Sequence, residues 1–431
     1  MLNLNLTVKK KLGEGGQGTV YLVEGSHGPQ AIKWYNLEQS TEEQKQSISS
    51  LVRTGPPQGV AGQRFIWPLD LVTLPNEACF GYLMPLIDTS KFVVLGEVQA
   101  HLKPAPGFQA LCEISYQAAN SYRALHLTGH CYRDISAGNL MFDTKKGEVL
   151  ICDNDNVGVN RQSESQVWGT MEYMAPEVVR KEANPSTETD LHSLAVLLFN
   201  LWVWHHPMHG DMEAKIRVWD LPAKRRIYGE QPVFIFDPHD KRNQLPSDPA
   251  YATAAKRWGF CPKSLQRLFV RAFTEGLKNP ANRVTEGEWQ SLFRQLKDNI
   301  ISCPSDGAEN VWDVNSTNFH CWHCNKAIPV PPKLVFQQAS GKHYLLLTHA
   351  TKMLKRHINP SVSEADASMI IGQVVQNPAN PQVWGIRNET STPWLADFAN
   401  GTTKEIPPQK SAPLNAGLQL NINGVKAQVI P

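Results

Sequence analysis

The sequence predicts an α+β protein with a strand-rich start and a helix-rich middle, followed by a short knuckle-like segment and a small β-sandwich. Residues 1–87 alternate apolar and polar positions around a glycine-rich stretch, which is typical of antiparallel strands. Residues 88–300 contain two long stretches with apolar residues at helical spacing. From 331 to 431, short β-branched runs are separated by turns rich in Pro, Asn and Gly. Residues 301–330 form the linker between these regions.

Composition narrows the class of protein. The chain has 431 residues, 41% of them hydrophobic and 19% charged, which describes a globular protein of two or three domains. A net charge of +2 is too weak to predict a nucleic-acid partner. The longest apolar run, residues 194–203, is too short to span a bilayer.

Eight cysteines scattered along so long a chain suit a reducing compartment, and the start reads as a strand instead of a signal peptide. We therefore expect a cytoplasmic protein with no membrane partner.

A glycine-rich stretch opens the informative part of the chain. Gly13, Gly15, Gly16 and Gly18 let the backbone turn tightly and bring N–H groups close to phosphate oxygens. The β-like run 19–23 argues against a dinucleotide site, which needs a helix after the last glycine. The alternative is a glycine-rich hairpin that binds nothing.

Lys33 lies inside the apolar run Ala31-Ile-Lys-Trp-Tyr35. A lysine in such a strand usually points to solvent. At this distance from the glycines it can also reach the α- and β-phosphates of a nucleotide.

The loop 132–142 offers a carboxylate, Asp134, and five residues later a carboxamide, Asn139. The first can orient a hydroxyl nucleophile and the second can hold a metal ion, which is the arrangement that phosphoryl transfer needs. Taken alone, this spacing is also typical of a capped turn.

An apolar strand then ends in Asp153-Asn-Asp155-Asn. Carboxylates at the end of a strand are natural ligands for Mg²⁺, which prefers oxygen. An Asx-rich turn without metal is the alternative.

These motifs, in this order over residues 8–298, resemble the protein kinase family. The resemblance implies a bilobal fold, with an N-terminal lobe over 1–87 and a C-terminal lobe over 88–300. Residues 168–177, Trp-Gly-Thr-Met-Glu-Tyr-Met-Ala-Pro-Glu, are similar to the end of a Ser/Thr kinase activation segment. The resemblance implies ATP and Mg²⁺ as cofactors and protein Ser/Thr hydroxyls as substrate, including those of the chain itself. The cofactor-binding residues that it implies are Gly13, Gly15, Gly18, Val20, Ala31, Lys33, Met84, Leu86, Asn139 and Asp153.

The resemblance also assigns catalytic roles. Lys33 positions the phosphates, Asp134 accepts the proton of the substrate hydroxyl, and Asn139 holds Mg²⁺. Asp153 best matches the second Mg²⁺ ligand, with Asp155 as the other candidate or as an additional ligand.

Supporting roles follow in the same way. Asp190 braces the catalytic loop and begins a buried helix, and Arg283 pairs with Glu177. Ser163, Ser165 and Thr170 are candidate phosphorylation sites.

The chain departs from the family pattern at several positions. Tyr132 replaces the usual histidine, Ser136 the usual lysine, and Asn154 the usual phenylalanine. The helix predicted over 42–52 offers Glu42 or Glu43 as the partner of Lys33, both near its start. Either that helix is short and shifted, or the ion pair is missing.

The glycine-rich start, the Tyr-Arg-Asp-Ile-Ser loop and the Asp-Asn-Asp-Asn stretch together look like kinases of bacterial tellurite-resistance-type stress systems. That likeness implies a von Willebrand factor A protein and a PP2C-type phosphatase as partners. Two rivals stay open: a pseudokinase scaffold that binds nucleotide and recruits partners through its C-terminal domain, and a small-molecule kinase.

The last 130 residues carry two further signals. Cys321 and Cys324 form a Cys-x2-Cys knuckle that can hold Zn²⁺, and the remaining ligands are open among Cys303, His320, His323 and His343. The alternative is a turn without metal. Residues 372–424 resemble a forkhead-associated domain without its phosphothreonine-reading residues, which implies an interaction domain.

Overall fold

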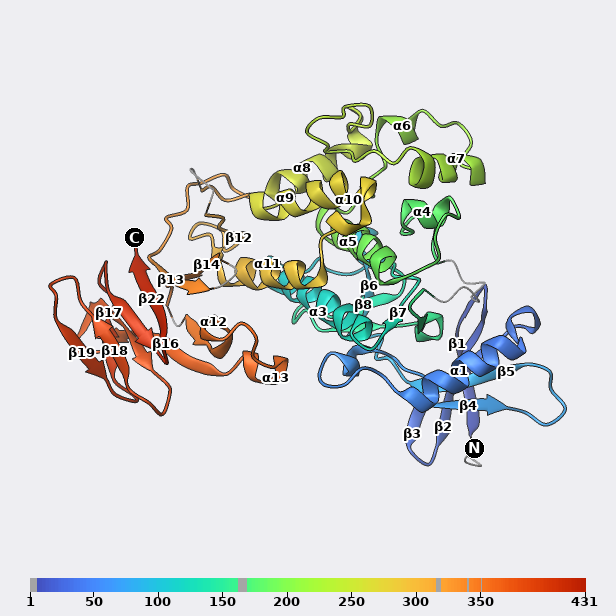
Figure 1. Ribbon diagram of the computed structural model, residues 1–431, viewed down its shortest axis with the longest axis horizontal. Helices are drawn as coiled ribbons and strands as arrows, with labels where there is room; N and C mark the ends of the chain where they lie inside the picture. Colours follow the sequence, from blue (N-terminus) through green and yellow to red (C-terminus); the bar gives the residue numbers. More distant parts are fainter. Residues whose placement is uncertain (1–5, 162–168, 315–318, 339–340, 350) are drawn as a thin grey trace. The chain divides into compact units, whose positions relative to one another are not determined.

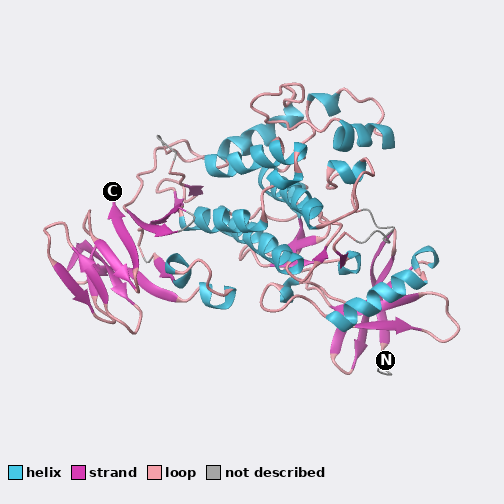
Figure 2. Ribbon diagram, in the orientation of Figure 1, coloured by secondary structure: helices cyan, strands magenta, loops and turns pink. Residues whose placement is uncertain are grey.

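The computed structural model describes residues 6–161, 169–314, 319–338, 341–349 and 351–431. Contacts divide the chain into two units, Met1–Ser291 and Leu292–Pro431 (Figures 1 and 2). This division falls inside helix α11 (Glu286–Asp298), a few residues before the predicted boundary at 300. Most of the strand predicted over 1–6 lies outside the described residues.

An antiparallel sheet begins the first unit, with strand order β1-β2-β3-β5-β4. Its strands are β1 (Thr7–Gly15), β2 (Gly18–Gly25), β3 (Gly28–Tyr35), β4 (Asp70–Thr73) and β5 (Phe80–Pro85). The apolar run 65–72 is typical of a strand, but the strand in this region starts only at Asp70. In this register Lys33 lies between Val20 on one neighbouring strand and Tyr82 on the other.

Helix α1 (Glu42–Thr54) belongs to the same part of the unit (Figure 1). The side chain of Thr41 caps its first turn by accepting a bond from the Gln44 N–H, at 3.1 Å. Gly55 ends the helix with φ 72°, a conformation that favours glycine. The buried side chains of Ile48 and Leu51 form its inner face.

The rest of the first unit is mainly helical, with a small sheet ordered β6-β8-β9 and a β7–β10 pair. The two long helices are α3 (Phe108–His126) and α5 (Thr187–Val203). The short strands are β6 (Val93–Val94), β7 (His130–Cys131), β8 (Leu140–Phe142), β9 (Val149–Ile151) and β10 (Gly158–Val159). The other α-helices are α2 (Leu95–Gln99), α4 (Pro176–Val179), α6 (Asp211–Ala214), α7 (Leu221–Arg225), α8 (Ala252–Phe260), α9 (Lys263–Ala272) and α10 (Glu275–Lys278).

Helix α5 begins at Thr187, three residues before its predicted start at Asp190. Ser186 caps it by accepting from the Thr189 N–H, so Asp190 is buried in the first turn instead of capping the helix. Because Asp190 does not cap the helix, its carboxylate can accept hydrogen bonds from the loop that begins at Tyr132.

The second unit contains two antiparallel sheets that share one apolar core, consistent with the predicted β-sandwich. Residues from both sheets enter that core, among them Phe336, Trp394, Ile371 and Ile386. The first sheet is ordered β14 (Gly341–Leu346), β13 (Lys333–Gln338), β22 (Val425–Ile430), β21 (Gln419–Ile422), β18 (Trp394–Asp397) and β19 (Thr403–Ile406). The second is ordered β15 (Lys352–Leu354), β16 (Ile370–Asn377), β17 (Asn380–Asn388) and β20 (Ser411–Pro413).

Short elements complete the second unit. A hairpin of β11 (Ile300–Ser302) and β12 (Glu309–Val311) precedes the sandwich, and the helices α12 (Lys355–Ile358) and α13 (Glu364–Ala367) follow β15. Helices α12 and α13 and strands β15, β18, β19 and β20 were not predicted, because each has only three or four residues.

Asp298, at the end of α11, ties three side chains together within the second unit. Its oxygens accept two bonds from Arg356, both at 2.7 Å, one from His343 at 2.8 Å and one from His357 at 3.0 Å. Burial opposes its charge, but Arg356 and the histidines hold the pKa of Asp298 well below its usual range. Every oxygen of this carboxylate is therefore occupied by protein donors.

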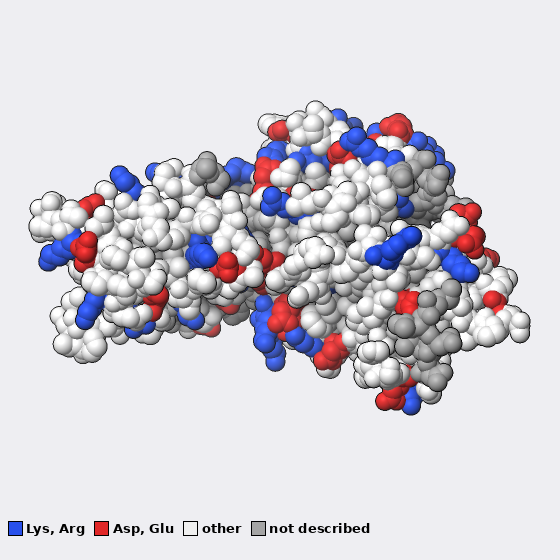
Figure 3. Space-filling model, turned by 60° about the horizontal axis from the view of Figure 1, so that its bottom comes forward, with Lys and Arg blue, Asp and Glu red and all other residues white. Residues whose placement is uncertain are grey.

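Charges are interspersed on the surface. On the face drawn in Figure 3, basic and acidic side chains lie near one another among uncharged ones. Among the described residues, no helix combines the length and the hydropathy needed to cross a bilayer.

We predict that Asp298→Asn destabilises the second unit by about 3–5 kcal/mol, because it removes the anion that the largely buried Arg356 contacts. Hydrogen exchange of the β13 and β14 amides in the full chain measures this loss. Asp366→Asn is the control, since Asp366 pairs with Lys355 at a more exposed site and should change stability by less than about 1 kcal/mol. Equal effects of the two substitutions would contradict the prediction.

Candidate active site

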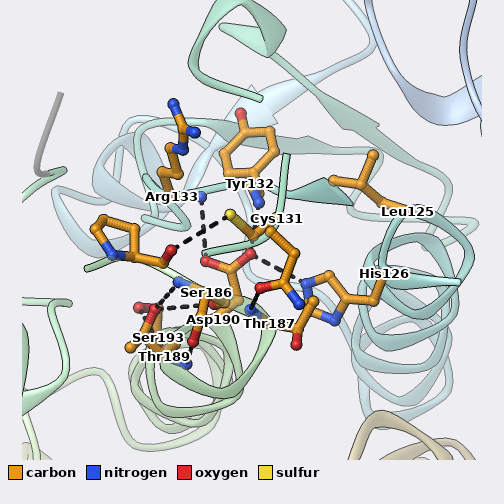
Figure 4. A network of polar contacts seen from close by, with 12 residues as sticks. Leu125, His126, Cys131, Tyr132, Arg133, Ser186, Thr187, Thr189, Asp190 and Ser193 are labelled. Carbon is orange, nitrogen blue, oxygen red and sulfur yellow. Dashed lines mark hydrogen bonds and ion pairs between the residues drawn. The ribbon is translucent and has the colours of Figure 1, made fainter. Parts of the chain in front are cut away.

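The loop between β7 and β8 is held in shape by one buried carboxylate (Figure 4). Asp190 accepts backbone N–H bonds from Tyr132 at 2.5 Å and from Arg133 at 3.1 Å. Arg133 has φ 73°, a left-handed conformation that is costly for a non-glycine residue and that these bonds help to stabilise. The bracing role predicted for Asp190 is therefore present in the geometry.

A buried histidine supports Asp190 from the other side. His126, in the last turn of α3, contacts Asp190 through Nε2 at 3.0 Å and Glu286 through Nδ1. Burial alone would lower the pKa of His126, but the bonds to the two carboxylates outweigh it and raise the pKa to about 9. The charged imidazolium thus balances two acidic groups below the catalytic loop.

The loop brings together Asp134 and Asn139 as the spacing predicted. Asn139 donates through Nδ2 to the Asp134 side chain at 3.0 Å and to its backbone carbonyl at 2.9 Å. Thr170 donates to the other Asp134 oxygen through its N–H at 2.7 Å and its hydroxyl at 2.8 Å. Asp134 is thus oriented from two sides, and the Oδ1 of Asn139 is left as an acceptor for a metal ion.

Asp153 follows β9 in a left-handed conformation with φ 49°. Its position is coupled to the catalytic loop, because the Tyr132 hydroxyl donates to the carbonyl of the preceding residue, Cys152. The Asp153 side chain is partly buried and 46% exposed, so part of it stays accessible. Burial and the nearby Asp155 raise the pKa of Asp153 above its usual value despite Lys33.

Asp155 lies in a different environment. Its side chain is fully buried and accepts bonds from Lys33 at 2.9 and 3.2 Å, from Tyr35 at 2.6 Å and from Tyr82 at 3.2 Å. Because protein donors occupy both oxygens, this geometry does not fit the Mg²⁺ role predicted for Asp155. Burial and Asp155 raise the pKa of both tyrosines, which keeps their hydroxyls protonated as donors.

Asp155 instead serves as the main anion for Lys33. Burial would lower the pKa of Lys33, but Asp155 and Asp153 together raise it, so the ammonium stays charged. Lys33 also donates to Gln17 in the glycine-rich turn at 2.8 Å and to Asp153 at 3.4 Å.

The described hydrogen bonds of Lys33 do not include Glu42 or Glu43, the partners predicted from the helix. Helix α1 reaches the cluster through Gln44, whose amide donates to the Tyr35 hydroxyl at 2.9 Å. Among the described contacts, the ion pair of Lys33 with a helix glutamate is therefore missing, and the paired acid comes instead from the segment after β9.

The glycine-rich turn has room for a ligand. A Cβ added at Gly13, Gly15 or Gly16 would meet nothing within 4 Å, whereas one at Gly18 would lie 2.1 Å from the carbonyl oxygen of Trp34. The first three glycines leave backbone accessible, and Gly18 is required by close strand packing.

The remaining predicted nucleotide contacts cluster on three strands of this sheet. Val20 and Met84 are half-buried, Ala31 is buried opposite Met84, and Leu86 is exposed just after β5.

The donor set fits a nucleotide with Mg²⁺. Asn139 and Asp153 supply oxygen ligands of the kind that Mg²⁺ prefers. Burial raises the pKa of Asp153, and the nearby negative charge of Asp155 adds to the rise; a divalent cation would offset that negative charge. Lys33, charged and adjacent to the glycine-rich turn, supplies the positive charge that phosphates need.

Helix α4, which follows residues 169–175, is also held by an ion pair. Arg283 and Glu177 form the predicted pair, at 2.8 Å, with Arg283 almost completely buried. Ser163 and Ser165 lie outside the described residues, whereas Thr170 is bonded to Asp134.

Sequence reasoning missed the roles of Gln17, Tyr35, Tyr82 and His126. A weak signal existed for Tyr35, because residues two apart on a strand share a face and Tyr35 follows Lys33 by two. No local signal marks the other three, since their partners lie far away in the chain.

We predict that Asp155→Asn lowers the free energy of unfolding by about 3–5 kcal/mol, because Lys33 and two tyrosine hydroxyls lose their buried anion. Urea denaturation of the full chain, followed by tryptophan fluorescence, measures the loss. Asp153→Asn is the matched control and should cost less than about 1 kcal/mol, as its side chain is half exposed. The reverse ranking would contradict the assignment.

The His126 cluster predicts a pH dependence of stability. A histidine whose pKa rises from 6.5 to about 9 on folding contributes stability that is complete below pH 6.5. That contribution, about 3 kcal/mol, is lost as the pH rises from 6.5 to 9. Urea denaturation across this range should show a shrinking difference between the parent and His126→Gln. A constant difference would rule out the charged state of His126.

Comparisons with known proteins agree with this geometry. A family model described as a protein kinase domain matches residues 6–251. Ribosomal protein S6 kinase alpha-4 of Mus musculus is 26% identical over 295 residues, 63% of this chain and 35% of that protein. Serine/threonine-protein kinase PkaB of Streptomyces coelicolor is 25% identical over 219 residues, 47% of this chain and 50% of that protein. The chain thus spans a third to a half of these relatives, and it belongs to the protein kinase domain family.

Proposed function

We propose that the protein is an ATP-dependent protein kinase that phosphorylates Ser and Thr hydroxyls, including its own. Two linked contact sets carry this proposal. Lys33 bonds to Gln17 of the open glycine-rich turn and to Asp153. Asn139 bonds to Asp134, and its backbone carbonyl accepts from the N–H of Cys152, the residue before Asp153. The names of the matched relatives, which include a bacterial serine/threonine-protein kinase, support the same activity.

Each residue has a separate task in the reaction. Asp134, fixed by Thr170 and Asn139, orients the substrate hydroxyl and accepts its proton as the oxygen bonds to the γ-phosphorus. The bond from that phosphorus to the bridging oxygen breaks, and ADP leaves. Lys33 holds the α- and β-phosphates. Mg²⁺, when bound by Asn139 and Asp153, neutralises phosphate charge.

The pairing of Lys33 weakens the rival interpretation as a pseudokinase scaffold. The missing helix glutamate favoured that interpretation, but Asp155 provides Lys33 with an equivalent anion from another segment. Ser136 still departs from the family pattern, so the scaffold stays as the alternative outcome of the experiment below.

The cellular setting is part of the same proposal. The likeness to kinases of tellurite-resistance-type systems supports a bacterial stress role in the cytoplasm, with a von Willebrand factor A protein and a PP2C-type phosphatase as partners. The β-sandwich supports a forkhead-associated-like interaction domain. Its buried Asn388 organises the following turn by bonding to Thr390 and Thr392. The zinc proposed at Cys321 and Cys324 is developed in the next subsection.

We predict that purified full-length protein incorporates label from radioactive ATP with Mg²⁺ on Ser or Thr. Asp134→Asn should reduce the rate about 10²–10⁴-fold by removing the proton acceptor. Asp153→Ala should abolish labelling by removing a metal ligand. Asp70→Asn, a carboxylate of the same unit outside the site, is the control and should keep the parent rate.

Absence of label on the parent, with ATP and Mg²⁺ still raising its melting temperature, would favour the scaffold. Equal labelling of the parent and of Asp153→Ala would overturn the assignment of the site.

A further inference from the structure

Two turns in the second unit repeat one pattern. Cys303-Pro-Ser-Asp306-Gly307 and Cys321-Trp-His-Cys324-Asn325 each place a metal-ligating residue at their first and fourth positions. The fifth residue of each turn has a positive φ, 75° at Gly307 and 58° at Asn325. The second turn is the predicted knuckle, and the first has Asp where the second has Cys.

The backbone bonds of the two turns match. The N–H of Gly307 donates to the Cys303 carbonyl at 2.9 Å, and the N–H of Asn325 donates to the Cys321 carbonyl at the same distance. The backbone N–H of the first cysteine in each turn donates to the carbonyl oxygen five residues later, at 2.8 Å in both cases. The turns are therefore structurally equivalent, although their sequences share only one cysteine position.

Each turn also directs a backbone N–H at its first sulfur. Ser305 donates to Cys303 Sγ and His323 donates to Cys321 Sγ, both at 3.4 Å. Such bonds stabilise a thiolate and orient it for a metal ion.

The four side chains converge on one point. Their ligand atoms all lie within 4.8 Å of one another. Cys303 Sγ is 3.7 Å from Cys324 Sγ, and Cys321 Sγ is 3.7 Å from both oxygens of Asp306. A tetrahedral ion with bonds of about 2.3 Å to sulfur places two sulfurs ~3.8 Å apart, so the observed spacing fits such an ion.

The apolar cluster around the two turns is small. Cys303 and Cys321 are buried with Ile328 in a small cluster that few other apolar side chains complete. A core this small rarely holds a segment by itself, and natural proteins supplement such cores with metals or disulfides. The described cysteines are free thiols, so they are available as ligands for a metal ion.

We propose that Cys303, Asp306, Cys321 and Cys324 form a structural Zn²⁺ site. Three thiolates and one carboxylate in a closed tetrahedral set suit Zn²⁺ and leave no open position for catalysis. His323 supports the site from outside, since its Nδ1 lies 2.9 Å from the Asp306 oxygen Oδ2. This inference stands apart from the proposed kinase activity, because all these residues belong to the second unit.

The test measures metal content and metal release in the full chain. Elemental analysis of dialysed protein should find about one zinc per chain. Cys303→Ser and Asp306→Ala should contain much less zinc, while Cys79→Ser, a cysteine of the first unit, should match the parent. Zinc-free parent refolded with Co²⁺ should show the visible absorption of tetrahedral cobalt bound by thiolates.

Two further variants keep the test decisive if a ligand variant fails to fold. Asp306→Cys completes a four-cysteine set, so it should retain zinc and release it to a chelator more slowly than the parent. His323→Ala should retain zinc but release it about tenfold faster, because Asp306 loses its supporting contact.

A parent that takes up no metal even after refolding with Zn²⁺ would overturn the proposal. Full zinc content in Asp306→Ala together with zinc loss in His323→Ala would instead identify His323 as the fourth ligand and overturn the assignment of Asp306. Kinase activity does not enter any of these measurements.

Discussion

The buried pair of Lys33 and Asp155 is the interaction on which the site depends. An ammonium group in the middle of a sheet is stable only if anions and hydrogen-bond acceptors surround it. Asp155 provides the negative charge that Lys33 needs. The hydroxyls of Tyr35 and Tyr82 donate the remaining hydrogen bonds to the Asp155 carboxylate. Because Asp155 follows β9 while Lys33 lies on β3, this one pair ties the sheet to the segment that also carries Asp153.

The pair also changes how the helix α1 is connected to the site. A glutamate on that helix would make the charge state of Lys33 depend directly on where the helix lies. Here the connection passes from Gln44 through the Tyr35 hydroxyl to Asp155. Only the bond from Gln44 to Tyr35 joins two neutral groups, and such a bond is weaker than a buried ion pair. The contact between Lys33 and Asp155 involves no residue of α1.

The same principle recurs in both units: a buried carboxylate fixes a functional or structural element. Asp190 holds two backbone N–H groups of the catalytic loop, with His126 balancing its charge. In the second unit, Asp298 anchors Arg356 and two histidines at the end of α11. In each case removing the acid would take an acceptor away from donors that are largely shielded from water, which is more costly than never having made the contact.

The sequence by itself determined the family and the order of the motifs, and it predicted Lys33, Asp134, Asn139 and Asp153 as the site residues. These are local patterns, in which spacing along the chain reflects a strand, a turn or a loop directly. Only the tertiary structure decided that Asp155 pairs with Lys33, 122 residues away, and that Asp306 faces the cysteine knuckle. The physical reason is that both carboxylates acquire their partners through folding, and no local pattern encodes which distant side chain will be the neighbour.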